Sequence, residues 1–526
     1  MAIVAVVLAA YFGLSAAVNR YVENRLLGWA SEALIDDAEI NFSSTEAGIL
    51  RGKIRLGEFA LMRKSGDDTL WSVTASEVEL RLKPLLFTSK DEHSFTIRHL
   101  DLTMPRVDIR RENPDFNVFR SAGEKAQKAA ENTEIKIDRL SVHSGQLHYL
   151  KGRPGGISVR YSATASEARL RKGDLSAESY NFRLTDLAYT DAEGVYRTEV
   201  RSAIIRHKAP EVELIGIKTG PAIDAESFKE RFPFRKSMIS GETGRVSVFG
   251  LRGNLKDSLM IGTVKIDRPV WSIERDNSLP LPDRTMPMPQ EALADLGIHF
   301  QADSILLVRG ALDIQISDTH RKLPASLRFR QVNAEVTGVG NIDRSAPAFT
   351  ARAYGVVEDQ TETALYTEYR YGAEHPWKLR FTANELNLVR LTPLLEAAVR
   401  VEIQSGEMKS LDLKLDGNGE KTEGRIDFMY ENLVFDIASK NENNSSRAGH
   451  FFSETLGKLL YRKSHEAGDG LETVTFHTER DSRKGFTGQW TDALLEGATR
   501  TVVRIDQDRA AGLGEKIKDI FSRSDK

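Results

Sequence analysis

The sequence predicts a mainly β protein: an elongated, curled, repeating β-sheet groove, taco-like in section, with an N-terminal transmembrane helix and a few short amphipathic helices. Three observations support this prediction. Apolar and polar residues alternate with period two, as in residues 95–113, FTIRHLDLTMPRVDIRREN. The same pattern returns in residues 259–277, LMIGTVKIDRPVWSIERDN, and such repetition is typical of elongated β architectures. Residues 2–18 carry no charge.

The N-terminal run, AIVAVVLAAYFGLSAAV, has a length at the lower limit for a membrane helix. We expect an uncleaved anchor over residues 1–30. A cleaved signal peptide is the alternative, because Ser15-Ala16-Ala17 could serve a peptidase. Arg20 and Arg25 follow the run and no Lys or Arg precedes it, so the positive-inside rule alone would place the body in the cytoplasm.

An internal duplication is predicted at about residues 95–150 and 259–315. The aligned positions, at an offset of 164 or 165 residues, are Pro105 with Pro269, Ile109 with Ile273, Arg111 with Arg275, Asn113 with Asn277, and Gly145 with Gly310. A proline within such a stretch indicates a bend or a sheet edge. The alternative is that any two amphipathic strands look alike.

The remaining elements follow the same alternation. We assign residues 31–440 to the β body and residues 441–526 to closing strands and amphipathic helices. Gly417-Asn418-Gly419 between two alternating stretches predicts a hairpin. Short helices are expected at residues 290–296 and, within residues 386–399, after Pro393, and amphipathic helices at 451–461 and 508–521.

Composition excludes several classes of function. The 526 residues are 40% hydrophobic and 28% charged, and 73 Lys and Arg balance 76 Asp and Glu to a net charge of −3. Without a basic excess, no nucleic-acid partner is expected. The absence of cysteine removes disulfides and thiolate metal sites.

No catalytic motif was found. The sequence has no GxSxG elbow, phosphate loop, HExxH or EF-hand spacing, and its 11 histidines are scattered. We therefore expect no enzyme activity, no cofactor and no metal site.

The order of motifs resembles that of a known family. The N-terminal third contains, in order, GILRGKIRLGEFAL, VTASEVELRLKPLL and FTIRHLDLTMPRVDIRRENPDFNVF, and the C-terminal third contains SGEMKSLDLKLDGNG, EGRIDFMYENLVFDI and GFTGQWTDALLEGATRTV. Together they resemble the AsmA-like family of bacterial envelope proteins, the AsmA/TamB/YhdP group. The resemblance implies an inner-membrane, single-pass protein with its body in the periplasm and a β-groove that carries phospholipid between inner and outer membranes. It also implies a role in envelope lipid homeostasis and possible outer-membrane or envelope protein partners.

Seven residues are expected to share the apolar lining of the groove: Leu80, Leu100, Leu102, Ile109, Val264, Ile266 and Ile273. A closed β-sandwich would bury the same side chains in a dry core. The alternative function is therefore a structural or assembly factor for outer-membrane proteins.

Overall fold

The computed structural model describes residues 38–48, 52–65, 68–82, 94–110, 134–150, 155–171, 174–253, 257–318, 324–399, 401–437, 464 and 473–502. The expected anchor at residues 1–30 and the expected helices at 451–461 and 508–521 lie outside these residues. None of the described helices combines the length and the hydropathy that a membrane span requires. The chain divides into two compact units, Met1–Ile223 and Asp224–Lys526, and each is described by itself.

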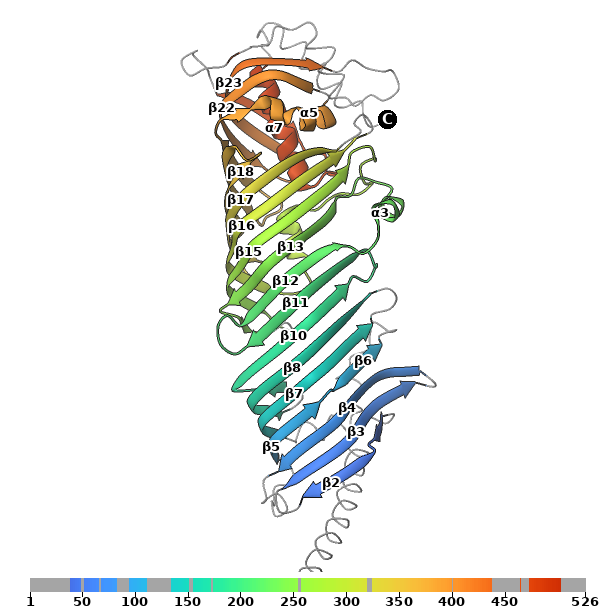
Figure 1. The fold of residues 1–526 in the computed structure, drawn as a ribbon. Coiled ribbons are helices and arrows are strands. Elements are labelled where there is room, and N and C mark those ends of the chain that lie inside the picture. Colours follow the sequence, from blue (N-terminus) through green and yellow to red (C-terminus); the bar gives the residue numbers. More distant parts are fainter. Residues whose placement is uncertain are drawn as a thin grey trace, which may run out of the picture. The chain divides into compact units, whose positions relative to one another are not determined.

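The mainly β prediction is confirmed, and the first unit contains no helix among its described residues (Figure 1). Its strands are β1 (Ala38–Asn41), β2 (Ser44–Gly48), β3 (Lys53–Ser65), β4 (Asp68–Leu82), β5 (Ser94–Thr103), β6 (Arg106–Arg110), β7 (Glu134–Leu150), β8 (Gly156–Arg171), β9 (Asp174–Ser176), β10 (Ser179–Thr190), β11 (Tyr196–Arg206) and β12 (Val212–Pro221). They pair in the order β3, β4, β5 with β6, β7, β8, β10, β11, β12. Within the described residues of this unit, β7 alone runs parallel to its neighbours β5 and β6.

The second unit also contains a mixed, mostly antiparallel sheet, but it carries helices. The strands are β13 (Met238–Phe249), β14 (Arg252–Gly253), β15 (Leu259–Asp276), β16 (Phe300–Ser317), β17 (Ala325–Gly340), β18 (Pro347–Val357), β19 (Thr361–Arg370), β20 (Trp377–Ala383), β21 (Leu386–Asn387), β22 (Val401–Gly417), β23 (Lys421–Ile437) and β24 (Val474–Glu479). The helices are α3 (Ala225–Arg231), α4 (Pro289–Ala294), η3 (Leu388–Leu391), α5 (Thr392–Val399) and α7 (Phe486–Val502). The pairing order is β13, β15, β16, β17, β18, β19, β20, β22, β23, β24, and only β15 and β16 are parallel among the described pairs.

Three local predictions are confirmed in the second unit. The hairpin at Gly417-Asn418-Gly419 joins β22 to β23, and the Oδ1 atom of Asn418 accepts the backbone N–H groups of Glu420 and Lys421, both at 2.9 Å. The expected helix at residues 290–296 is α4. The helix expected within residues 386–399 is α5, and η3 precedes it.

The two repeated stretches have the same strand pairing. Arg106 lies opposite Gln146 in the parallel pair of the first unit, and at the aligned position of the second unit Val270 lies opposite Ala311. The residue before each aligned proline and glycine has a positive φ: Met104 46°, Ser144 54°, Arg268 52° and Arg309 56°. The prolines therefore mark bends inside paired strands, because the strands on both sides continue past them.

The apolar alternation moves by one position at these bends. In β5 and β6, for example, Leu100 and Leu102 precede the bend, whereas Val107 and Ile109 follow it. The paired strands keep the same number of residues across the bend at Pro105, whereas β7 has one more residue than β8 between Val142 and Gly145, as in a β-bulge. The bend therefore keeps the apolar side chains on one face along the whole length of a bent strand.

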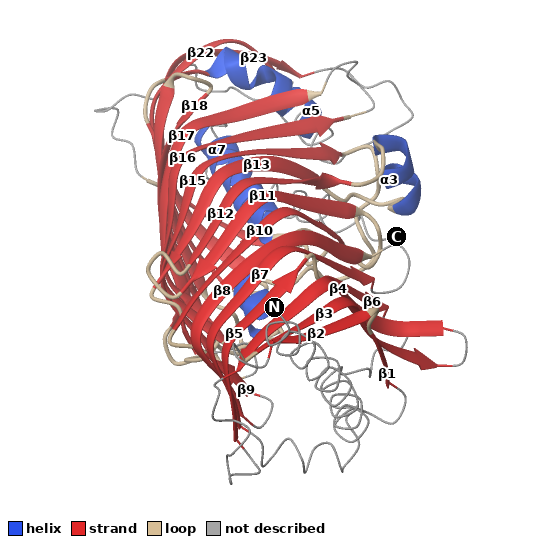
Figure 2. Cartoon of the chain, turned by 60° about the horizontal axis from the view of Figure 1, so that its bottom comes forward, coloured by secondary structure: helices blue, strands red, loops and turns tan. Residues whose placement is uncertain are grey.

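Two helices of the second unit, α5 and α7, pack against the apolar face of its sheet. α7 contacts β23 and β24, and α5 contacts β16, β17 and β22, which are separated by several strands in the sheet. One short helix can reach both places only if the sheet curls around it, as Figure 2 shows. The largest core of the described residues lies here, around Trp377, Leu413 and Tyr430.

Candidate functional site

The candidate site is the apolar face of the first unit's sheet, which we call the first apolar face. One row of directly opposed residues crosses eight strands of this face: Leu56, Val78, Leu102, Val142, Ala163, Phe182, Ile205 and Val212. A second row crosses six strands: Ile54, Leu80, Leu100, Leu140, Ala165 and Tyr180. Because directly opposed side chains project to the same side of a sheet, both rows form a single surface.

The structure brings together the lining residues that the sequence predicted for this unit. Leu80, Leu100 and Leu102 pack in one cluster with Leu56 and Val78. Ile109 lies beyond the bend at Pro105, directly opposite Trp71 on one side and Tyr149 on the other. Leu80, Leu100, Leu102 and Ile109 are all partly exposed, although Trp71 is buried.

The three predicted residues of the second unit also share a face. Val264 and Ile266 lie opposite Ile305 and Leu307, and Ile273 lies opposite Ile314. The row through Ile266 crosses ten strands: Val246, Ile266, Leu307, Ala334, Ala353, Leu365, Phe381, Leu413, Ile426 and Val474. We call this surface the second apolar face.

The second apolar face is covered at one end and not at the other. Leu413 and Ile426 are 2% and 1% exposed in the core beneath α7, whereas Val264 and Ile266 are partly exposed. The helix docks closely because Ala493 and Gly497 face the strands. A Cβ atom on Gly497 would lie only 2.6 Å from the Phe476 ring. The sequence predicted amphipathic helices in residues 441–526, and the family resemblance of GFTGQWTDALLEGATRTV fell on this segment, but neither indicated which strands it covers.

The opposite face of the first unit's sheet is polar and held by ion pairs. Glu79 accepts salt bridges from Lys53 at 2.7 Å, Arg81 at 2.9 Å and Arg55 at 3.4 Å. Burial alone would raise the pKa of Glu79, but the hydrogen bonds from Lys53 and Arg81 outweigh it and lower the pKa to about 2. Glu79 is only 8% exposed, so these ion pairs take the place of much of its hydration.

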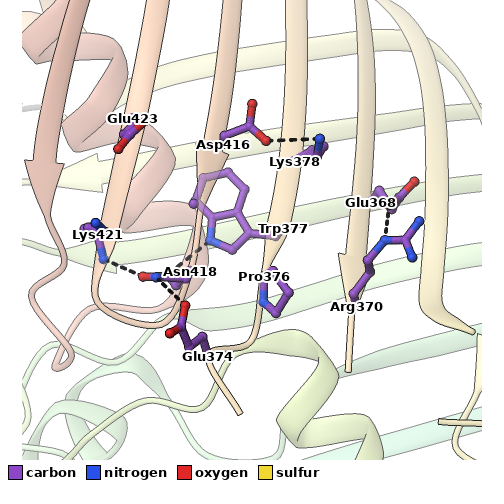
Figure 3. A pocket seen from close by; sticks show the side chains of 11 residues that line it. Glu368, Arg370, Glu374, Pro376, Trp377, Lys378, Asp416, Asn418, Lys421 and Glu423 are labelled. Atoms are coloured by element: carbon purple, nitrogen blue, oxygen red, sulfur yellow. Dashed lines mark hydrogen bonds and ion pairs between the residues drawn. The ribbon is translucent and has the colours of Figure 1, made fainter. Parts of the chain in front are cut away.

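A polar pocket of about 260 Å³ lies at the ends of β20 and β22 (Figure 3). Four of its charged side chains form two ion pairs: Arg370 donates to Glu368 at 2.5 Å, and Lys378 pairs with Asp416 at 3.4 Å. The Trp377 indole N–H donates to the backbone carbonyl of Asn418 at 3.3 Å. Neither a nucleophile–base pair nor a metal-binding group of three ligands is found among the described residues, so this pocket carries no recognisable chemistry.

Comparison with known proteins adds no relative. No protein-family model matches the chain, and no curated protein matches it.

Proposed function

We propose that this chain is an AsmA-like protein of the bacterial envelope, anchored in the inner membrane by residues 1–30 with its body in the periplasm. In this proposal the apolar faces hold phospholipid acyl chains during transfer between inner and outer membranes or in envelope lipid homeostasis. The motif order of the sequence supports the family, and the two apolar faces support the cargo.

The first apolar face is the observation that carries the proposal. Eight strands spaced by about 4.8 Å make it roughly 40 Å wide. Leu56, Val78, Val142 and Ala163 are 5%, 8%, 7% and 4% exposed, whereas Leu102, Phe182, Ile205 and Val212 on the same row are partly exposed. Soluble monomers rarely leave a large contiguous apolar surface open to water. No described residue of the first unit supplies a second layer, so an apolar occupant would account for this surface.

Acyl chains suit such a surface chemically. They need only dispersion contacts and exclusion from water, which Leu, Ile, Val and Phe side chains provide. The headgroup can remain in water, so transport requires no catalytic residue. The lack of a catalytic constellation among the described residues is compatible with this role, although it does not establish it.

Photo-crosslinking in cells tests the proposal with matched pairs of neighbouring residues. A benzophenone amino acid is placed at Phe182 or Ile266 on the apolar faces, and at Asn181 or Lys265 as controls. These controls are exposed and belong to the opposite faces of the same strands. Mass spectrometry of the purified full chain then identifies the adducts.

We expect phospholipid adducts at Phe182 and Ile266 and few at Asn181 and Lys265. Equal crosslinking at all four positions would argue against a lipid path. Protein adducts without lipid at the apolar positions would instead favour the assembly-factor alternative.

A further inference from the structure

Two arginines meet at the end of β15, beside the second apolar face. Arg275 lies two residues after Ile273 in the strand, and its direct partner across β16 is Ile316, which packs against Ala397 of α5. Its side chain therefore belongs to the apolar face. Arg235 reaches the same place from the loop after α3 and donates from Nη2 to the backbone carbonyl of Asn277 at 2.8 Å.

Not every N–H donor of Arg235 and Arg275 has an acceptor among the described residues. The Nε atoms of Arg235 and Arg275 are buried and have no hydrogen-bond partner among the described residues, and the same is true of the Asn277 side-chain oxygen. A guanidinium group left in this state loses hydration without replacement, which is costly. Arg275 and Asn277 also lie in the repeated stretch, where they align with Arg111 and Asn113. Binding of acyl chains alone gives these polar residues no role.

Three carboxylates act on these arginines: Asp492 on Arg275, and Asp318 and Asp276 on Arg235. Asp492 of α7 also pairs with Lys484 at 2.6 Å, and Asp276 pairs with Lys229 at 2.7 Å. Burial lowers the pKa of Arg275, and burial together with repulsion from Arg275 lowers that of Arg235. Two of the three counter-charges of this guanidinium pair are therefore shared with lysines.

We propose that Arg235 and Arg275 bind the phosphate group of a phospholipid whose acyl chains lie along Ile273 and Ile266. Arginine suits this ligand because its planar fork donates two hydrogen bonds to phosphate oxygens. The position favours a lipid over free phosphate, since the apolar side chains of β15 begin two residues away on the same face. This inference rests on the proposed function. It adds to that function a contact between the protein and the lipid headgroup.

The test is a binding titration of the full chain in an uncharged detergent. Three probes separate the contribution of the phosphate group from that of the acyl chains: dioctanoyl phosphatidic acid, dioctanoylglycerol of the same chain length, and inorganic phosphate. The variants are Arg235→Gln and Arg275→Gln, with Lys265→Gln on the exposed polar side of β15 as a matched control. Thermal unfolding is recorded for each variant.

We expect dioctanoyl phosphatidic acid to bind more tightly than either other probe. Each arginine variant should weaken its binding by about tenfold or more, as loss of a charged hydrogen bond implies, and should leave dioctanoylglycerol binding unchanged. Lys265→Gln should change neither. If phosphatidic acid and dioctanoylglycerol bind equally in wild type and variants, the arginine site is wrong while the apolar path stands. If neither lipid binds, the proposed function fails as well.

A further variant separates ligand binding from a purely structural role. If Arg275 only holds α7 through Asp492, Asp492→Asn should weaken phosphatidic acid binding as much as Arg275→Gln does, which would overturn the proposal. In an anion site, removing this carboxylate should leave the affinity unchanged or increase it. Phosphate binding as tight as that of phosphatidic acid would also overturn the assignment to a lipid.

Discussion

The backbone carbonyl of Pro105 accepts a hydrogen bond from the backbone N–H of Gln146 at 2.8 Å. This contact lies immediately after Met104, which has a positive φ, and carries the parallel ladder from β5 to β6 without a break in the sheet. A proline in the middle of a sheet is tolerated here because it lies at the bend between the end of β5 and the start of β6. The bend at Pro105 is therefore part of the paired sheet and does not interrupt it.

This arrangement predicts that Met104→Gly is tolerated. Met104 has a φ of 46°, which is strained for a residue with a side chain. It is 57% exposed, so removing its side chain loses few packing contacts. Glycine adopts this backbone conformation without steric cost, and we expect unchanged stability or a gain of up to about 1 kcal/mol. Chemical denaturation of the full chain measures it.

Arg98→Gly is the matched control, because Arg98 is an exposed residue of the same strand without positive φ. It should lose about 0.5 to 1 kcal/mol through backbone entropy. Equal losses from both substitutions would show that Met104 does not adopt a positive φ in solution.

Leu102→Glu and Leu413→Glu should behave differently, although both replace an apolar residue on an apolar sheet face. Leu413 is 2% exposed beneath α7, so the carboxylate would be buried without a partner and should cost several kcal/mol. Leu102 is partly exposed on the first apolar face, so the new charge can reach water and the fold should survive.

Thermal unfolding and lipid crosslinking, measured on the same preparations, distinguish the two effects. Leu102→Glu should keep its unfolding temperature close to that of wild type and lose lipid adducts at Phe182. If it unfolds as readily as Leu413→Glu, the first apolar face is a closed core and the lipid path through it is refuted.

Glu79 should make the first unit sensitive to acid. Its pKa is lowered to about 2 from a usual value of 4.5, so the folded state favours the carboxylate. The stabilisation is complete above pH 4.5 and is lost as the pH falls through about 2, because protonation removes the attraction of Lys53 and Arg81. It amounts to something on the order of 1 to 3 kcal/mol, since the lysine and arginine partners are partly solvated.

Unfolding free energies measured from pH 7 to pH 2 test this prediction. Glu79→Gln should be less stable than wild type at pH 7, and the difference should shrink in acid. Glu77→Gln is the control, because Glu77 pairs with Arg55 alone at 3.1 Å and is more exposed. A difference between Glu79→Gln and wild type that does not depend on pH would contradict the ion-pair account.

Much of this fold was predictable from the sequence because β-structure has a local signature. Period-two alternation located β4, β5, β15 and β16, and the Gly417-Asn418-Gly419 turn located the hairpin. The aligned prolines and glycines at Pro105, Pro269, Gly145 and Gly310 predicted two stretches that do have the same strand pairing. The seven lining residues were chosen on alternation alone, and within each unit they fall on one face.

Other features depended on contacts between distant segments. Whether Leu413 is covered depends on where α7 docks, and that docking depends on the fit of Gly497 against Phe476. The buried state of Glu79 required Lys53 and Arg55 from β3 as well as Arg81 from its own strand. The meeting of Arg235 with the end of β15 required a loop and a strand to come together. By itself, the sequence determined which side chains point the same way, because alternation is a property of one strand. Only the tertiary structure decided which of them are covered, because burial depends on what packs from elsewhere in the chain.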